Sequence, residues 1–270
     1  MKITILGCGN MGLTYARAFL QYRKTTFEDL TLIAKDDKHA ADLNLMKLGK
    51  VIVGTSPESL QCDVLILAVK PQDFVDVARS LKGKIPPETL VISILAGVKL
   101  DTLKEKLEHK YIVRAMPNMP AQFGMGITVY IPSSDANVHH LSTVENLLNT
   151  TGRTFMIENE DLMDGVTALS GSGPAYFYYI VKIMTETAKK MGFDESLANL
   201  LVMHTMHGAF HVMNNSDTEL DKLISKVASK GGTTEAALKT MKDNKFDEIF
   251  ATAILNAEKR SKELSELNGK

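Results

Sequence analysis

The chain has 270 residues, of which 44% are hydrophobic and 23% charged, and its formal net charge at pH 7 is -1. This length favours two domains, and the composition is typical of a globular protein. A charge so close to zero, with no cluster of like charges, argues against nucleic acid or an anionic membrane as a partner. No stretch reaches the roughly 20 apolar residues of a membrane span, and the first apolar segment is too short for a signal peptide. We therefore expect a cytoplasmic protein.

Cysteine and histidine usage points away from disulfides and metals. The two cysteines, Cys8 and Cys62, form no C-x-x-C pair and have no histidine at zinc-ligand spacing, which predicts a reducing compartment. His204, His207 and His211 share one face of a predicted helix, but no carboxylate joins them at ligand spacing. The sequence therefore predicts no metal site.

The first apolar run, residues 2–6, leads directly into the pattern G-x-G-x-x-G. The run predicts a strand, and residues 13–22 predict a buried helix behind it. In this motif Gly7 allows a tight turn, Gly9 allows the backbone to approach a pyrophosphate, and Gly12 allows the helix to pack closely on the strand. The anion would lie at the N-terminus of the helix. The residues that we expect to contact it are Leu6, Gly7, Gly9, Asn10, Met11 and Gly12.

The end of the next predicted strand, residues 30–34, bears on the choice between NADP and NAD. In this fold an acidic residue there binds a free ribose 2′-hydroxyl, whereas a basic residue accommodates a 2′-phosphate. Here Lys35 comes first and favours NADP, while Asp36 leaves NAD open. Alternatively, residues 35–38 are an exposed helix start with Asp36 or Asp37 as the N-cap.

Further apolar runs alternate with helical patterns as far as residue 156. Predicted strands lie at residues 51–53, 63–69, 90–94, 111–116, 126–131 and 153–156, and predicted helices begin at residues 55–59 and span residues 137–149. From residue 160 only helical patterns follow. The sequence thus predicts an α/β fold: a doubly wound, Rossmann-type sheet in a dinucleotide-binding domain (1–159), then an all-helical domain (160–270).

Two loops follow predicted parallel strands at the edge where ligands bind in such sheets. One follows the run at residues 63–69, and the other, residues 117–120, is stiffened by two prolines. A structural turn is the alternative for the second loop. The residues that we expect to face the cofactor from these loops are Ala68, Val69, Lys70, Pro71 and Asn118.

Two segments interrupt the helical pattern of the C-terminal part. Residues 170–176 place two glycines and a proline within an otherwise long apolar helix, which requires close approach of backbone or ligand. At residues 227–237 a helix ends, a Gly-Gly turn follows, and a new helix begins with Thr233 or Thr234 as its cap. The amides at that helix start could bind a carboxylate. The alternative is a plain helix-turn-helix with a threonine cap, and the two interpretations are compatible with each other.

Five segments together resemble the pyrroline-5-carboxylate reductase family. They occur in the family's order and are Gly7-x-Gly9-Asn10-Met11-Gly12, Ala68-Val69-Lys70-Pro71, Arg114-Ala115-Met116-Pro117-Asn118-x-Pro120, Ser170-Gly171-Ser172-Gly173-Pro174-Ala175 and Ser229-x-Gly231-Gly232-Thr233-Thr234. The resemblance implies reduction of 1-pyrroline-5-carboxylate to L-proline by NADPH or NADH, the last step of proline biosynthesis. It also implies a homodimer formed through the helical domain, with possible further assembly.

The resemblance also implies which residues bind the substrate. The turn would hold the substrate carboxylate, and Thr234, the expected catalytic residue, would place its hydroxyl near the imine nitrogen. The implied substrate-binding residues are Ser229, Gly231, Gly232, Thr233 and Thr234. Two departures from the family pattern stand out, since Lys230 replaces a proline of this turn and Met119 a threonine of the double-proline loop.

Other interpretations remain open at this stage. The chain could reduce another cyclic imine, or could belong to the related β-hydroxy acid dehydrogenases. The latter need a lysine four residues beyond the second glycine of their helical motif, where this chain has Phe177. A non-catalytic NADPH sensor would need the first glycine turn but not the second.

Overall fold

The computed structural model describes residues 1–268. It divides into two compact units: the first is residues 1–172 together with the chain from Ala257 onward, and the second is Gly173–Asn256. The predicted boundary between residues 159 and 160 stays a prediction. The two compact units do not test it, because the first unit contains residues from both ends of the chain.

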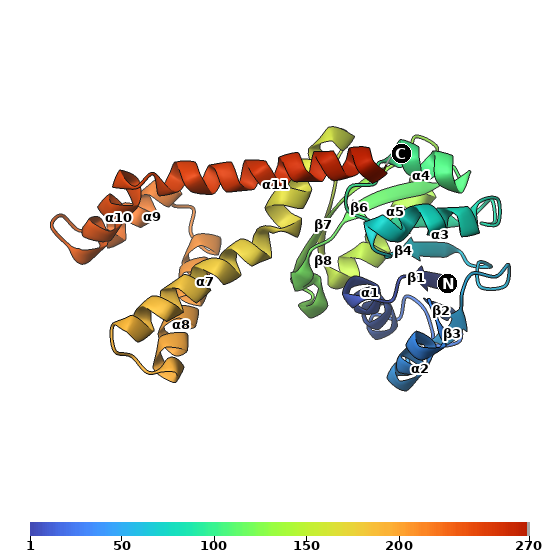
Figure 1. The fold of residues 1–270 in the computed structure, drawn as a ribbon, viewed down its shortest axis with the longest axis horizontal. Helices are drawn as coiled ribbons and strands as arrows, with labels where there is room; N and C mark the ends of the chain where they lie inside the picture. The colour runs from blue at the N-terminus through green and yellow to red at the C-terminus, as the bar shows by residue number, and fades with distance from the viewer. Residues whose placement is uncertain (269–270) are drawn as a thin grey trace. The chain divides into compact units, whose positions relative to one another are not determined.

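The first unit is built on one eight-stranded sheet (Figure 1). Its strands are β1 (Ile3–Leu6), β2 (Leu30–Ala34), β3 (Lys50–Val53), β4 (Val64–Leu67), β5 (Leu90–Ser93), β6 (Ile112–Met116), β7 (Gly126–Pro132) and β8 (Gly152–Met156). They lie in the order β3-β2-β1-β4-β5-β6-β7-β8, and all neighbours are parallel except the antiparallel pair β6 and β7. The chain order reverses between β1 and β4, which is where a doubly wound sheet binds its ligand.

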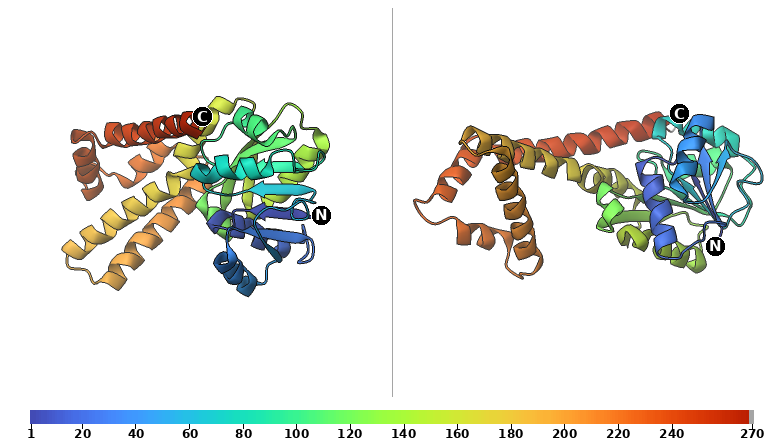
Figure 2. Two further views of the ribbon diagram at one scale, coloured as in Figure 1. Left: turned by 45° about the vertical axis from the view of Figure 1, so that its right-hand side comes forward. Right: turned by 90° about the horizontal axis from the view of Figure 1, so that it is seen from below.

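Helices cover both faces of the sheet, as the views in Figure 2 show. One core cluster joins the sheet to α1 (Asn10–Gln21), α2 (Asp37–Met46) and α5 (Val138–Leu148), and the other joins it to α3 (Phe74–Leu81), α4 (Leu100–Leu107) and α6 (Met163–Val166). Alternate strand residues supply the two clusters; in β4, for example, Ile66 packs into the first and Leu65 into the second. Short turns η1 (Pro71–Asp73), η2 (Met119–Phe123), η3 (Asn149–Thr151), η4 (Glu160–Leu162) and η5 (Thr167–Gly171) complete this unit.

The predicted fold class is confirmed, but the helix start predicted at residues 55–59 is wrong. Residues 55–59 form a turn and not a helix start. The backbone N–H of Ser56 donates to Ser59 Oγ (2.9 Å), and that of Ser59 donates to Ser56 Oγ (3.1 Å). These two bonds satisfy the turn, and the chain then continues to β4 with Leu60 buried.

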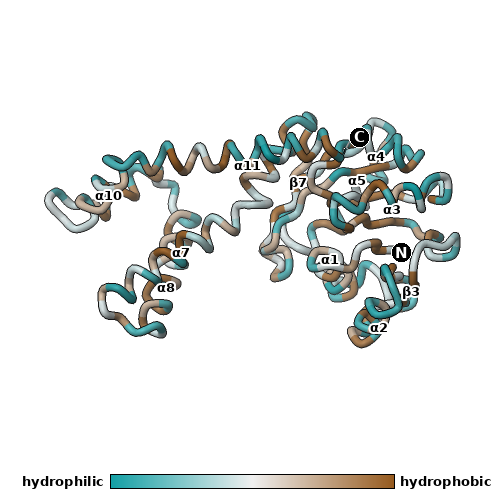
Figure 3. Tube along the Cα trace, in the orientation of Figure 1, coloured by the Kyte–Doolittle hydropathy of each residue, from teal (hydrophilic) through white to brown (hydrophobic). Residues whose placement is uncertain are grey.

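The second unit is helical throughout. It holds α7 (Gly173–Lys190), α8 (Glu195–Asn214), α9 (Leu220–Val227), α10 (Thr233–Asp243) and the first half of α11 (Phe246–Asn268). Figure 3 shows hydrophobic stretches along α7 and α8. Many of these side chains are exposed in the single chain, among them Tyr178, Tyr179, Leu200 and Phe210. Such a unit needs a partner surface to bury its apolar side chains.

The glycines and proline of residues 170–176 do not lie within one helix, as the sequence had suggested. The π-helical turn η5 ends at Gly171, and α7 begins at Gly173, so that Pro174 falls in its first turn. Proline is tolerated there because the amide that it lacks would have no intrahelical partner. The helical pattern thus continues through a change of helix type.

Polar contacts fix the C-terminal half of α11 within the first unit. The buried carboxylate of Asp164 accepts hydrogen bonds from Ser261 Oγ (2.6 Å) and Ser265 Oγ (3.3 Å), and Asn268 Nδ2 donates to the carbonyl of Gly97 (3.0 Å). Nearby, the guanidinium of Arg114, only 2% exposed, pairs with Glu160 at 2.7 Å. Among residues 1–268, no helix is long and apolar enough to cross a membrane.

Two histidines are held neutral at the amino-terminal edge of the sheet. His109 Nε2 donates to the carbonyl of Thr89 (2.6 Å), and burial lowers the pKa of His109, with Lys110 adding to the effect. Burial also lowers the pKa of His140, and its neighbour His139 lowers it further. In addition, His140 Nδ1 accepts the backbone N–H of Asn137 in the capping box of α5, which requires that nitrogen to be unprotonated.

We therefore expect the free energy of unfolding to fall on acidification. In the unfolded chain a histidine protonates near pH 6.5, whereas His109 and His140 protonate at lower pH in the folded state. The unfolded state then binds more protons below about pH 6.5, so this stability is complete above that pH and is lost below it. Urea unfolding at pH 7.5, 6.5 and 5.5 measures the slope. The double variant His109→Gln, His140→Gln should show a shallower slope; an unchanged slope would contradict the assignment.

Candidate functional site

Two loops meet at the reversal point of the sheet. The turn after β1 carries the first glycine motif, and the loop after β4 carries Ala68 to Pro71. The N–H of Ala68 donates to the carbonyl of Leu6 (2.8 Å), which continues the β1–β4 pairing one residue beyond the end of β4. The predicted residues from both loops therefore lie together at the carboxyl edge of the sheet.

Glycine is required for different structural reasons at the three positions of the first turn. Gly7 has φ +101°, and a Cβ there would lie 2.3 Å from the carbonyl carbon of Ala68. At Gly12 a Cβ would lie 2.2 Å from the carbonyl oxygen of Gly7, so its absence allows α1 to approach the turn. At Gly9, in contrast, a Cβ would meet no atom of the described chain within 4 Å. Gly7 and Gly12 serve the packing of the protein, while Gly9 leaves open space beside the start of α1.

That open space adjoins unpaired amides. The first intrahelical bond of α1 runs from the N–H of Leu13 to the carbonyl of Gly9 (2.9 Å), so the amides of Asn10 to Gly12 have no acceptor within the helix. The positive end of the helix dipole reinforces these donors. This cradle, open at Gly9 and lined by amides, fits the pyrophosphate of a dinucleotide.

Cys8, which lies between the first two glycines, is buried and points inward. Its Sγ lies 3.7 Å from the carbonyl oxygen of Ile5 and 3.9 Å from that of Ile33. Burial raises the pKa of the Cys8 thiol to about 12, so that it stays protonated at neutral pH. Cys8 therefore packs the turn and supplies no nucleophile.

At the end of β2, the two residues that bear on cofactor choice, Lys35 and Asp36, make different contacts. The Asp36 side chain accepts the backbone N–H of His39 (2.8 Å) and so caps α2, as one of the two interpretations predicted. Lys35 is exposed, with its Nζ 3.8 Å from Asp36 Oδ2. The backbone N–H of Lys35 donates to His39 Nδ1 (3.3 Å), which ties the strand end to the helix. The carboxylate thus has a structural partner, while the ammonium faces outward.

Asn118 also has a structural partner. Its Oδ1 accepts the backbone N–H of Ile127 (3.0 Å) and holds the double-proline loop to β7. This contact takes one of the two lone pairs of Oδ1 and leaves the NH2 group for other partners. Met119, where the family pattern has threonine, begins η2 and is half exposed.

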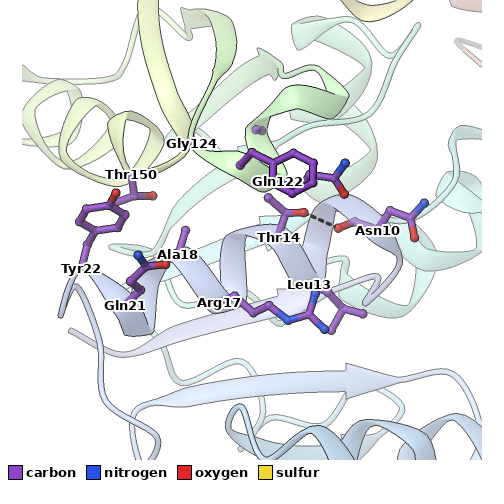
Figure 4. Close-up of a pocket in the computed structure, with 12 residues that line it drawn as sticks. Asn10, Leu13, Thr14, Arg17, Ala18, Gln21, Tyr22, Gln122, Gly124 and Thr150 are labelled. Carbon is purple, nitrogen blue, oxygen red and sulfur yellow. Dashed lines mark hydrogen bonds between the residues drawn. The ribbon is translucent and has the colours of Figure 1, made fainter. Parts of the chain in front are cut away.

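A groove of about 510 Å³ runs along α1 next to the glycine turn (Figure 4). One helical face forms its floor, with Asn10, Thr14 and Gln21 labelled in the figure, and the η2 segment forms its wall. Among the predicted cofactor residues in the described chain, Asn10 alone lines it. The groove is therefore distinct from the predicted cofactor position, although the two share the first residue of α1.

The predicted substrate turn lies in the second unit, between α9 and α10. Gly231 has φ +72°, and the N-cap of α10 is Gly232, with no side chain as cap, so the predicted threonine cap is wrong. Thr233 and Thr234 instead occupy the first two helical positions. The N–H of Gly232 donates to the carbonyl of Ser229 (2.9 Å), and the helical ladder begins with Ala236 donating to Gly232 (3.2 Å).

These bonds determine which amides of the turn remain for a ligand. The amides of Gly231 and Gly232 already have partners within the chain, whereas those of Thr233 and Thr234 precede the helical ladder. The threonine hydroxyls lie on the same two residues. The turn also lines an open groove of about 930 Å³ beside α9. A carboxylate at this helix start would therefore find the amides of Thr233 and Thr234 without an acceptor in the described part of the chain.

Sequence reasoning missed Glu235. Its carboxylate accepts the backbone N–H of Gly231 at 2.7 Å, which stabilises the left-handed conformation of that glycine. The signal was present in the sequence, since a Glu three residues after an N-cap is half of a capping box. The bond stiffens the turn from its helical side, where Lys230 has replaced the rigid proline of the family pattern.

Fold and site together define a class. A doubly wound sheet with a glycine cradle at its switch point, together with a helical unit that exposes apolar side chains, defines a dinucleotide-binding protein with a surface for a partner. Sequence comparison agrees with this class. Residues 2–97 match the family described as NADP oxidoreductase coenzyme F420-dependent, and residues 160–264 match pyrroline-5-carboxylate reductase dimerisation.

The chain belongs to the pyrroline-5-carboxylate reductase family. It is 36% identical to the pyrroline-5-carboxylate reductase of Vibrio alginolyticus, with 98% of each chain covered. It is 32% identical to pyrroline-5-carboxylate reductase 2 of Bacillus subtilis, with 98% of this chain and 95% of the relative covered. The solved structure of the Plasmodium falciparum pyrroline carboxylate reductase with NADP bound matches with a TM-score of 0.88 at 28% identity, over 98% of each chain.

The structure thus groups the predicted residues into two sets. The cofactor set, from Leu6 to Asn118, lies in the first unit, and the substrate set, from Ser229 to Thr234, lies in the second. Their individual roles stay predictions. For the described residues, no group of three potential ligands could hold a metal ion.

The contrast between Gly7 and Gly9 gives a test of the cradle. Gly7→Ala should destabilise the fold by about 3 kcal/mol or more, because the new Cβ meets backbone in a strained conformation. Gly9→Ala should keep the melting temperature within about 3 °C of the parent but weaken NADPH binding about tenfold. Thermal unfolding and a fluorescence titration with NADPH measure the two effects. Unchanged NADPH affinity in a folded Gly9→Ala protein would exclude this cradle.

Proposed function

We propose that this chain reduces 1-pyrroline-5-carboxylate to L-proline with NADPH as the preferred hydride donor, as a homodimer formed through its helical unit. The observation that carries the proposal is the presence, in a member of this family, of two helix starts that follow a glycine and whose first amides precede the helical ladder. One follows Gly9 and suits a pyrophosphate, and the other follows Gly232 and suits a carboxylate. The relatives named for this reaction cover nearly the whole chain.

The preference for NADPH rests on the end of β2. The exposed Lys35 ammonium suits a 2′-phosphate, and Asp36, which could have bound a free 2′-hydroxyl, caps α2 instead. The positive end of α2 adds to the attraction for a phosphate. A relative of known structure is described with NADP bound.

The chemistry asks little of the protein's side chains. NADPH, when bound, supplies a hydride to the imine carbon, and the nitrogen takes a proton, so that the C=N bond becomes the C–N bond of proline. The protein must orient the imine and exclude water. The amides of Thr233 and Thr234 would hold the substrate carboxylate, and the Thr234 hydroxyl would donate or accept a hydrogen bond at the nitrogen. Because a threonine hydroxyl is a poor acid, we assign it an orienting role.

Proline formation measured with NADPH and with NADH tests this function. We expect turnover with both, and a higher kcat/KM with NADPH. A parallel assay with the six-membered cyclic imine carboxylate tests the alternative substrate, and a β-hydroxy acid with NADP tests the dehydrogenase alternative. Binding of NADPH without turnover of any substrate would instead favour the non-catalytic sensor.

Substitution of Thr234 tests its role. Thr234→Ala should lower kcat about tenfold, which corresponds to the loss of one oriented hydrogen bond in the transition state. The KM for NADPH should stay within about twofold, because the cofactor contacts are predicted elsewhere. Thr240→Ala is the matched control, since it removes a hydroxyl of the same helix that already donates to the carbonyl of Ala236 (3.0 Å). An unaltered kcat in Thr234→Ala would exclude the assignment.

A further inference from the structure

The segment at the end of the first unit contains a rare helical turn that the fold alone does not explain. η5, Thr167–Gly171, is a π-helix, and its wide turn is closed by the N–H of Ser172 donating to the carbonyl of Thr167 (2.9 Å). A π turn inserts one residue more than an α turn would hold, and it occurs frequently at functional sites. The turn lies within the segment of small residues that the sequence singled out.

This turn packs against the end of β6. A Cβ on Gly171 would lie 2.4 Å from Cε of Met116, the last residue of that strand. β6 belongs to the half of the sheet beyond β4, and in a doubly wound sheet the second half receives the nicotinamide end of a dinucleotide at its carboxyl edge. The π turn is therefore next to the predicted position of the nicotinamide.

Ser170 presents an unpaired buried hydroxyl in this turn. Its Oγ is buried and has no hydrogen-bond partner among the protein groups of residues 1–268. A buried hydroxyl without a partner is unfavourable and needs an explanation. A serine that only packed the turn could be replaced by alanine without loss, whereas a serine that binds a ligand would have an unpaired hydroxyl when the ligand is absent.

We propose that Ser170 Oγ hydrogen-bonds the carboxamide of the nicotinamide ring and fixes the orientation of the ring. This rests on the proposed function, because it assumes that the cofactor is NADPH or NADP⁺. The carboxamide has a carbonyl acceptor and an NH2 donor, and a hydroxyl can serve either. The π turn then has a reason, since the extra residue moves Ser170 off the regular helical position. The substrate carboxylate and the imine nitrogen are assigned to the turn at Thr233 and Thr234, which leaves Ser170 for the cofactor.

The test compares two ligands that differ only in the nicotinamide. NADP⁺ and 2′-phospho-ADP-ribose are titrated into the intact protein by calorimetry, together with thermal unfolding of the protein without ligand. Ser170→Ala should weaken NADP⁺ binding about three- to tenfold, the loss of one hydrogen bond, and leave the nicotinamide-free ligand unchanged. The melting temperature without ligand should stay the same or rise, because an unpaired buried group has been removed.

A serine that already has a hydrogen-bond partner provides the control. Ser80→Ala removes a serine hydroxyl of α3 that already donates to the carbonyl of Val77 (2.7 Å), and it should change neither affinity. Equal weakening of both ligands by Ser170→Ala, no weakening of either, or a lowered melting temperature with unchanged affinities would each overturn the proposal. Failure of the unaltered protein to bind NADP⁺ would instead refute the proposed cofactor itself.

Discussion

The first unit depends on the close approach of two loops at the reversal point of its sheet. The turn at Gly7 and the loop at Ala68 touch backbone to backbone, in a space that has no room for even one methyl group. This contact continues the β1–β4 pairing past the end of β4 and sets the position of α1. The amides at the start of α1 and the residues after β4 therefore face the same edge, and the whole cofactor cradle depends on that spacing.

Both proposed binding functions use the same physical device, the free amides of a helix start after glycine. At α1 the cradle is kept open by a glycine whose missing side chain meets no protein atom of the described residues. At α10 a carboxylate of the chain itself, Glu235, fixes the glycine before the cap. The two starts thus reach a defined shape by different means, one through sheet packing and the other through a local side-chain bond. That difference follows from their settings, a buried sheet edge and an exposed turn.

The patterns that proved reliable were those in which burial leaves a strong periodic signal. β4 and β5 are buried on both faces and read as continuous apolar runs, and the glycines of the first turn mark a contact that no other residue permits. At residues 55–59 the signals of a helix start, a capping residue followed by proline, were misleading. Hydrogen bonds between Ser56 and Ser59 close an isolated turn there, and no helix follows. The details of the helical part were harder to predict from the sequence. A π turn at η5 has no composition of its own, and the Glu235 bond depends on the conformation of Gly231.

The site was predictable to a similar degree and for similar reasons. The motif residues occur where the sequence placed them in the fold, yet three of them also carry internal bonds that a motif does not reveal. Asp36 caps a helix, Asn118 holds β7, and the amide of Gly231 is taken by Glu235. A sequence pattern shows which residue types are present. It does not show which of their donors and acceptors are already used within the fold and which are left for a ligand, and only the structure shows that.

Helix α11 belongs to both units, with its first half in the second unit and its C-terminal half in the first. The first unit is completed by residues that follow the second, since Ser261 and Ser265 satisfy the buried carboxylate of Asp164. The second unit is therefore an insertion, held at both of its ends. Ending the chain after Ser172 would leave a buried charge without its donors, so the nucleotide-binding half is not a contiguous, separable piece of sequence. An isolated version of it would have to retain both of its segments, before Gly173 and after Asn256.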